Sequence, residues 1–185
     1  MSDSLSGRVL CPASDQTGLS EASSGMRPAM DELVLGESPR WHDGWLWVAD
    51  WAAHELITLD ACGTRQVADR RASVPCCIGA GGALSNRRVW AGLGDDHPDG
   101  ICLDAEGAVR AADVGNKNCV RVREGGQVLQ TVDADRGCFA CTLGGAGGRT
   151  LYIVTAQYPN DFRTPTGQVL AVQVSVPSAG AAAAG

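Results

Sequence analysis

Residues 29–176 consist of short apolar runs separated at close intervals by Gly, Asp and Asn. Almost none of this stretch has the 3.6-residue period of an amphipathic helix, whereas short alternating runs bounded by turn residues are typical of strands. The pattern predicts an all-β fold. We expect strands at 45–50, 55–59, 101–104, 108–112, 119–123, 127–132, 139–143, 151–155 and 168–174.

Three of these runs repeat one arrangement of strand, tight turn, strand, loop and strand. In the first two units a turn glycine, Gly44 or Gly107, precedes an aspartate by the same interval. Gly107 and Gly148 lie 41 residues apart (148 minus 107), close to the roughly 40 to 45 residues of a four-stranded propeller blade. The simplest interpretation is a β-propeller.

The blade count conflicts with a closed ring. Residues 29–176 are 148 residues, enough for about three to four blades, whereas closed propellers have about four to eight. We expect residues 1–28 and 177–185 to be tails, because neither has a periodic apolar pattern. An incomplete ring leaves strand edges unpaired. We therefore expect either a homodimer that completes the ring, with about seven blades' worth of sequence, or an open arc covered by a tail.

The charge balance argues against two classes of partner. The chain has 15 basic and 21 acidic residues, a formal net charge of -6 and a pI near 4.9, which argues against duplex nucleic acid and anionic membranes. It also has neither an apolar stretch of about 18 residues nor a signal-peptide pattern at its first residues. We expect a cytoplasmic protein with reduced thiols.

Residues 138–141 (CFAC) have the C-x-x-C spacing of redox and zinc motifs. No second C-x-x-C pair or H-x-x-x-H follows, and no helical pattern surrounds the motif. The favoured interpretation is two cysteines on a half-buried strand.

Residues 35–41 (LGESPRW) and 98–107 (PDGICLDAEG) resemble the senescence marker protein/gluconolactonase family, the regucalcin-like lactonases. Residues 136–141 and 166–169 look like the closing blade of that family. The similar stretches cover about 30–78 and 83–174, and their combination is specific although each motif alone is weak. The resemblance implies a six-bladed propeller with one divalent cation in its central channel. It also implies an enzyme that hydrolyses sugar or related lactones.

The chain departs from this family in two respects. Residues 74–78 look like the opening of the second blade and residues 84–87 like the end of the fourth, so about two to three blades' worth of family sequence is absent. That part would carry the family's metal-binding Asn and its substrate-binding Arg and Asn, so no substrate-binding residue is assigned. Arg110 stands three residues after its turn glycine, where the first unit has Trp47.

Glu37 and Asp99 are the candidate site residues. Glu37 lies seven residues before Gly44, and Asp99 lies eight before Gly107, so both begin the first strand of a unit. In a propeller this strand lines the central channel, and two converging carboxylates suit a hard divalent cation. Spacing alone leaves another interpretation open, because Asp99 before Gly100 is common turn chemistry and Glu37 is equally compatible with a solvated loop.

The resemblance implies that Glu37 and Asp99 bind the metal and that Asp99 transfers the proton. The predicted function is a metal-dependent hydrolase of sugar-type lactones, with Ca²⁺, Zn²⁺, Mn²⁺ or Mg²⁺ as the cofactor and a small-molecule lactone as the substrate. The alternative is a non-catalytic propeller remnant or a calcium- or ligand-binding module, for which the missing blades and Arg110 argue.

Two further sets of residues receive other roles. Asp50 and Asp113 recur past the end of the second strand of their units, where capping of a turn is expected. His42, His54 and His97 have no neighbouring Ser or Cys in a nucleophile motif, so a histidine-activated nucleophile is unsupported.

Overall fold

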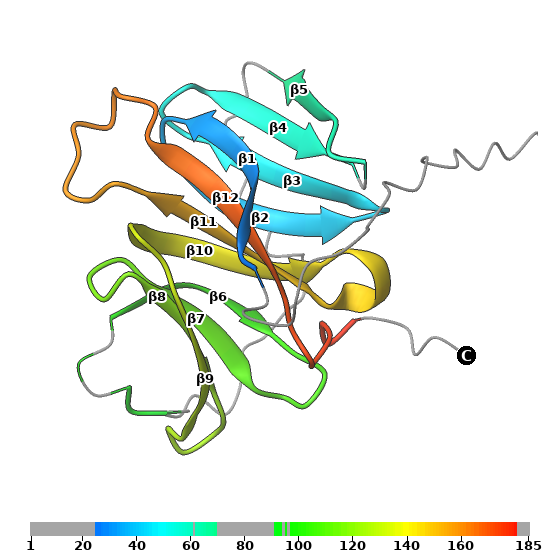
Figure 1. The fold of residues 1–185 in the computed structure, drawn as a ribbon, viewed down its shortest axis with the longest axis vertical. Helices are drawn as coiled ribbons and strands as arrows, with labels where there is room; N and C mark the ends of the chain where they lie inside the picture. The colour runs from blue at the N-terminus through cyan, green and yellow to red at the C-terminus, as the bar shows by residue number, and fades with distance from the viewer. Residues whose placement is uncertain (1–24, 61, 70–90, 94, 96, 181–185) are drawn as a thin grey trace, which may run out of the picture.

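The computed structural model describes residues 25–60, 62–69, 91–93, 95 and 97–180. Within these residues the strands form three four-stranded antiparallel sheets, named here blades I, II and III (Figure 1). Blade I contains β2 (Gly36–His42), β3 (Trp45–Asp50), β4 (Glu55–Leu59) and β5 (Arg65–Asp69). Blade II contains β6 (Pro98–Leu103), β7 (Val109–Asp113), β8 (Asn118–Val122) and β9 (Val128–Asp133).

Blade III is built from both ends of the described chain. It contains β10 (Gly137–Gly144), β11 (Thr150–Ala156), β12 (Gly167–Gln173) and β1 (Arg27–Leu33), with a short 3₁₀ turn, η1 (Ala146–Gly148), between β10 and β11. Strand β1 pairs with β12 through residues such as Met30 and Val169. The N-terminal strand therefore supplies the outer edge of the last blade and joins the two ends of the chain.

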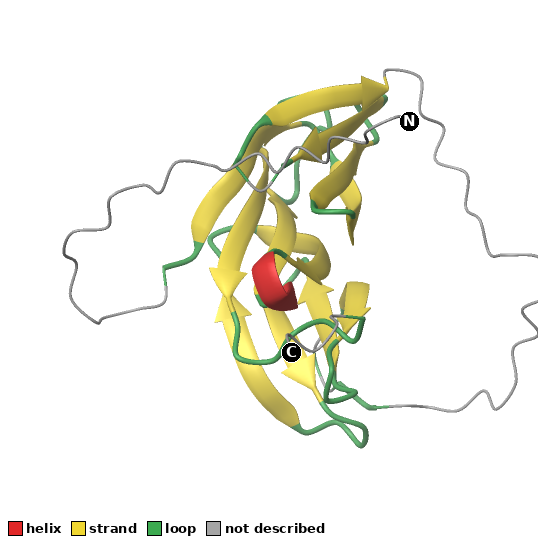
Figure 2. Ribbon diagram, turned by 90° about the vertical axis from the view of Figure 1, so that its right-hand side faces the viewer, coloured by secondary structure: helices red, strands yellow, loops and turns green. Residues whose placement is uncertain are grey.

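Blade III lies between the other two blades. Its inner strand β10 packs on β2 of blade I and on β6 and β7 of blade II. Figure 2 shows the three sheets following one another along a curved arc. The spatial order is therefore II, III, I, which is an arc of a propeller with two ends.

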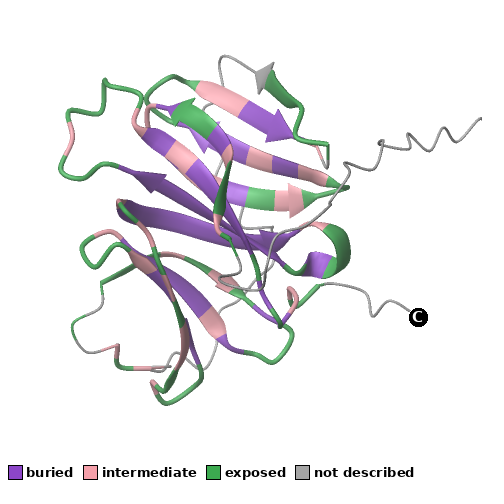
Figure 3. Ribbon diagram, viewed as in Figure 1, coloured by how far each residue is buried: buried purple, intermediate pink, exposed green. Residues whose placement is uncertain are grey.

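The two sides of blade III face different neighbours because side chains alternate along a strand. Ala140, Tyr152 and Val154 pack against blade I, in a core with Leu46, Val48 and other apolar side chains. The residues between them pack against blade II, in a core that joins Cys141, Leu143, Leu151 and Ile153 to Ala112 and Cys119. Strands β10 and β11 are consequently buried along their whole length (Figure 3).

The predicted all-β fold and incomplete propeller are confirmed. All nine expected strand ranges coincide with described strands to within three residues at each end, and three described strands, the outer strands β1 and β5 and the inner strand β2, lie outside those ranges. The part of the chain that the structure describes contains three blades, at the lower end of the three to four that its length predicts. Segments 74–78 and 84–87, which carry the expected deletion, lie outside the described residues, as do 1–24 and 181–185 of the expected tails.

The cysteines divide into two groups. Cys102, Cys119, Cys138 and Cys141 are free thiols, as expected, but Cys62 is disulfide-bonded, which corrects the expectation of reduced thiols at that position. The C-x-x-C pair lies on β10 and is fully buried. Separately, the described residues include no helix of the length and apolarity needed to cross a membrane.

Candidate functional site

Glu37 and Asp99 occupy the same position in their blades. Gly36 pairs with Asp50 in blade I, and Pro98 pairs with Asp113 in blade II. In each inner strand a bulge follows directly, between Glu37 and Arg40 or between Pro98 and Ile101. Both carboxylates therefore sit at the start of an inner strand, beside a bulge that changes the direction of the side chains that follow.

Two glycines bring these strand starts close to blade III. A side chain at Gly36 would collide with Leu33 and Val154, and one at Gly100 would collide with the backbone of Ala140. Glycine at these places lets β2 and β6 approach blade III from its two sides. Because Glu37 follows Gly36 and Asp99 precedes Gly100, the close approach also places these two carboxylates next to blade III.

Two aspartates at the ends of second strands hold the strand starts in place. Asp50 accepts backbone hydrogen bonds from Val34 (2.8 Å) and Leu35 (3.0 Å), which directly precede β2. Asp113 likewise accepts one from the backbone N–H of His97 (2.6 Å), directly before β6.

Each aspartate also caps the turn that follows it. Asp50 accepts a hydrogen bond from the backbone of Ala53 (3.2 Å), and Asp113 accepts one from that of Asn116 (2.8 Å). The expected capping role is confirmed. Sequence reasoning did not foresee that these aspartates also position Glu37 and Asp99, although their recurrence six residues after a turn glycine was the available signal.

Glu37 is half-buried, and its Oε2 accepts a hydrogen bond from the backbone N–H of Ser38 at 3.1 Å. Burial raises the pKa of Glu37, the Ser38 hydrogen bond opposes that rise, and the negative charge of Asp99 adds to it. Asp99 itself is exposed, and partial desolvation raises its pKa. The charge of Asp99 is thus the smallest of the three influences on Glu37, and desolvation alone accounts for the raised pKa of Asp99.

This pair has the chemistry of a cation site with few protein ligands. Carboxylate oxygens are the ligands that Ca²⁺ and Mg²⁺ prefer, and raised pKa values indicate acids without a compensating positive charge. Among the described residues no group of three or more His, Cys, Asp or Glu side chains is placed to hold a metal. Two carboxylates leave most coordination positions to water or to other donors.

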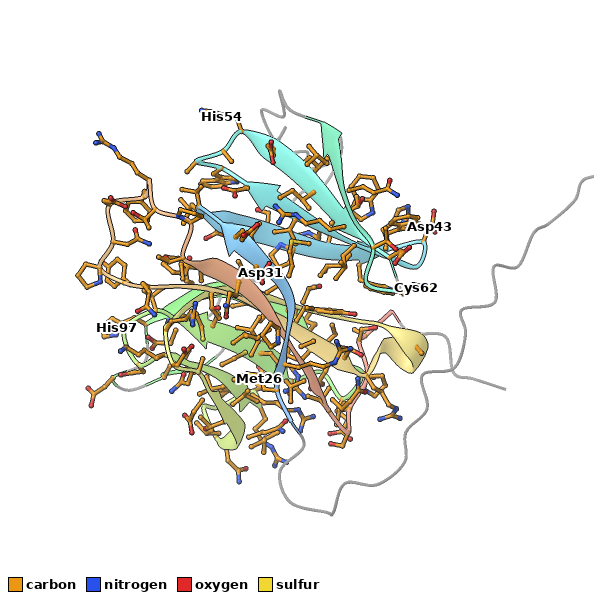
Figure 4. All side chains as sticks on the ribbon, turned by 45° about the horizontal axis from the view of Figure 1, so that its top comes forward. Met26, Asp31, Asp43, His54, Cys62 and His97 are labelled. Carbon is orange, nitrogen blue, oxygen red and sulfur yellow. The ribbon has the colours of Figure 1, made fainter. Side chains whose placement is uncertain are left out.

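The histidines do not converge on the pair. His54 lies in the turn between β3 and β4, and His97 lies before β6 of another blade (Figure 4). His42 pairs with Asp43 at 3.2 Å, at the opposite end of blade I from Glu37. The structure agrees with the absence of a histidine-activated nucleophile among the described residues.

Arg110 does not face the candidate site. Its side chain is 1% exposed and lies on the side of blade II that packs on blade III, close to Cys102 and Cys119. Its Nη1 donates to Oε1 of Gln130 at 3.1 Å, whereas Nε and Nη2 have no partner. Burial lowers the pKa of Arg110. The cation expected in place of an apolar residue is therefore a buried interface residue.

A hollow of about 490 Å³ lies at the other end of the inner strands, lined by Trp41, Leu143 and Ser178 together with glycines. It contains no titratable lining residue. The hollow therefore offers shape without acid or base chemistry.

Comparison with known proteins agrees with the predicted resemblance. Residues 76–157 match the family described as the SMP-30/Gluconolactonase/LRE-like region. No curated protein matches the sequence.

Three solved structures resemble the chain at low identity. They are a calcium-binding protein, regucalcin, from Agrobacterium tumefaciens (14% identity, TM-score 0.42, 79% of this chain and 48% of that one), a luciferin-regenerating enzyme (16%, 0.39, 79% and 47%), and a gluconolactonase from Xanthomonas campestris (17%, 0.38, 75% and 38%). The chain spans less than half the length of each.

Proposed function

Residues 76–157 belong to the SMP-30/gluconolactonase/LRE-like family, and from that membership we propose that the chain is a metal-dependent hydrolase of sugar-type lactones. Glu37 and Asp99 bind one divalent cation, which is Ca²⁺, Zn²⁺, Mn²⁺ or Mg²⁺, and Asp99 is the general base. The observation that supports the proposal is the placement of two carboxylates with raised pKa values at the same position of two inner strands.

Each residue contributes a distinct step. Glu37 offers its carboxylate oxygens to the cation while the Ser38 N–H holds one of them. Asp99 accepts a proton from the attacking water, and its raised pKa makes it a better base than an ordinary aspartate. A bound divalent cation supplies polarisation of the lactone carbonyl and a lowered pKa of the water. Asp50 and Asp113 each anchor one of the two strand starts to the second strand of its own blade.

A second candidate function is a non-catalytic module that binds a cation or ligand. It is favoured by the lack of a third acidic, histidine or cysteine ligand among the described residues. Such a site would bind a cation weakly because most of the hydration shell remains.

Calorimetric titration with each cation, followed by a lactone hydrolysis assay, tests the proposal. We expect Glu37→Gln and Asp99→Asn to lose both cation binding and hydrolysis. Asp43→Asn is the matched control, because this carboxylate is exposed in the turn at the other end of β2 and should change neither. Binding without hydrolysis of any lactone would favour the second function, and absence of binding would contradict both.

A further inference from the structure

Blades I and II contact blade III with opposite sides. Trp47 of blade I and Arg110 of blade II occupy the same position on the second strand of their blades. Each lies three residues before the aspartate that begins the following turn. Blade I packs on blade III with the alternate side, which carries Leu46 and Val48. Blade II uses the side that carries Arg110 and Ala112.

Each end of the arc therefore has one side that blade III does not use. We call the Trp47 side of a blade its front and the alternate side its back. The front of blade I and the back of blade II remain, and they are of opposite kinds. At both contacts between blades within the chain, the front of one blade packs on the back of the next. The unused front of blade I could therefore pack on an unused back of blade II in the same way.

The back of blade II is apolar and is exposed along β6, whereas Ala111, Val120 and Val122 are buried in a cluster against which Ala91 and Leu93 pack. Ile101 is 59% exposed and Leu103 is 55% exposed, although both are large apolar side chains. Beside them lies a hollow of about 390 Å³, lined only by Pro98, Ile101, Val109, Ala111, Val122 and the nearby Ala91 and Leu93. Contiguous exposed apolar surface of this kind marks an interface more often than it marks free surface.

The front of blade I offers aromatic and aliphatic surface beside the exposed Arg40, the cross-strand partner of Trp47, whereas Ala49 and Thr58 of this side are buried. Trp45 and Trp47 of β3 and Leu56 of β4 are each only partly buried. The indole N–H of Trp47 is itself enclosed and has no hydrogen-bond partner. Tryptophan is enriched at the energetic centres of protein interfaces.

The three blades that the described residues form leave both unused sides without a neighbouring blade. Another copy of the chain carries both a matching back and a matching front.

We propose that two copies of this chain close a six-bladed ring, in which the front of blade I of each copy packs on the back of blade II of the other. Two copies of three blades make six, within the range of about four to eight blades found in closed propellers. The two new interfaces are related by a two-fold axis along the ring axis, which is the commonest symmetry of soluble oligomers.

Ring closure also completes the candidate site. Each copy brings Glu37 and Asp99 to the starts of inner strands, so the closed ring places four carboxylates around its axis. This consequence rests on the proposed function, whereas closure of the ring does not. A divalent cation should strengthen the wild-type dimer, because it binds the assembled site better than the half-site. Glu37→Gln should remove that response without removing the dimer.

Light scattering coupled to size exclusion, at several concentrations of the full chain, tests the ring. We expect a mass of twice the 19.2 kDa of one chain. Ile101→Glu on the back of blade II and Leu56→Glu on the front of blade I should each raise the dimer dissociation constant by about 30-fold or more, as losses at interface hot spots do. Phe162→Glu is the matched control, because Phe162 is an exposed apolar residue of the β11–β12 loop, outside both sides.

Each outcome decides the proposal. Dissociation by both flank variants with native circular dichroism, and none by the control, supports the ring. A wild-type monomer at all concentrations overturns it and shows that the chain covers its own flanks. Dissociation by Ile101→Glu alone indicates back-to-back pairing, and masses that grow with concentration indicate an open filament, so either result overturns the closed ring. A dimer without a cation response leaves the ring standing and contradicts the shared site.

Discussion

Blades I and II are copies of one pattern, yet they present different chemistry to blade III. Blade I places Leu46, Val48 and other large apolar side chains against it, in a core without charged residues. Blade II places Ala112 and Cys119 there, together with the buried guanidinium of Arg110. The repeated backbone therefore tolerates two kinds of interface, and only one of them satisfies all of its buried polar groups.

Residues at the same strand position in blades I and II differ in burial, because blade III covers opposite sides of the two blades. Leu46 is fully buried because blade III covers the back of blade I. Val109 occupies the equivalent position of β7 and is only partly buried, because no blade covers the back of blade II among the described strands and Ala91 and Leu93 pack there instead. Equivalent positions in the two blades should therefore differ widely in their contribution to the free energy of unfolding.

The largest effect is expected for truncation at these two positions. Leu46→Ala should lower the free energy of unfolding by about 2 to 5 kcal/mol, because it leaves a cavity between blades I and III. Val109→Ala should cost less than about 1 kcal/mol at a concentration where the chain is monomeric. Urea denaturation measures both. Equal losses would contradict the assignment of one covered and one open back.

A smaller effect of opposite sign is expected at Arg110. Arg110→Met should raise the free energy of unfolding by about 1 to 3 kcal/mol, because it removes two buried N–H groups without partners and keeps an apolar side chain of similar length. The substitution makes the interface of blade II resemble that of blade I.

Arg163→Met is the control for that substitution. Arg163 is exposed in the loop between β11 and β12, so its replacement should change stability by less than about 0.5 kcal/mol. Thermal denaturation of both variants provides the comparison. Destabilisation by Arg110→Met would mean that its contacts with Gln130 and the nearby Asp104 outweigh the cost of burial.

The sequence allowed much of the fold to be predicted where strands have regular apolar alternation, as in β3, β7 and β11. Strand β5 (RQVAD) contains one large apolar residue, so its sequence has no apolar alternation that would predict a strand. It is a strand because it pairs with β4. Strand β1 buries Met30 and Leu33, three residues apart, because register shifts interrupt its pairing with β12. Alternation alone therefore misses it.

The candidate site was predictable in position but not in environment. Similar spacing to a turn glycine, seven residues for Glu37 and eight for Asp99, placed both at equivalent strand starts, and the pairing of the strands agrees with that placement. The roles of the two carboxylates in metal binding and proton transfer stay predictions. Spacing contains no information on which side of a blade its neighbour covers, so the burial of Arg110 between blades II and III had to come from the structure.

The smallest effect is expected from the carboxylates themselves, and it separates Glu37 of blade I from Asp99 of blade II. An acid whose pKa is higher in the folded state holds more protons there than in the unfolded chain, so stability falls as the pH rises through the two pKa values. Both acids have raised pKa values, so their charged forms destabilise the fold at neutral pH. Glu37→Gln should therefore raise the free energy of unfolding at pH 7, by less than about 1 kcal/mol because solvent screens a half-buried group.

The gain in the free energy of unfolding should vanish below the unfolded pKa of about 4.3. Asp99→Asn should show a smaller gain, since Asp99 is exposed. Urea denaturation of the three proteins between pH 4 and pH 7, without divalent cations, measures the difference, and a gain that persisted at pH 4 would mean that packing rather than charge is responsible.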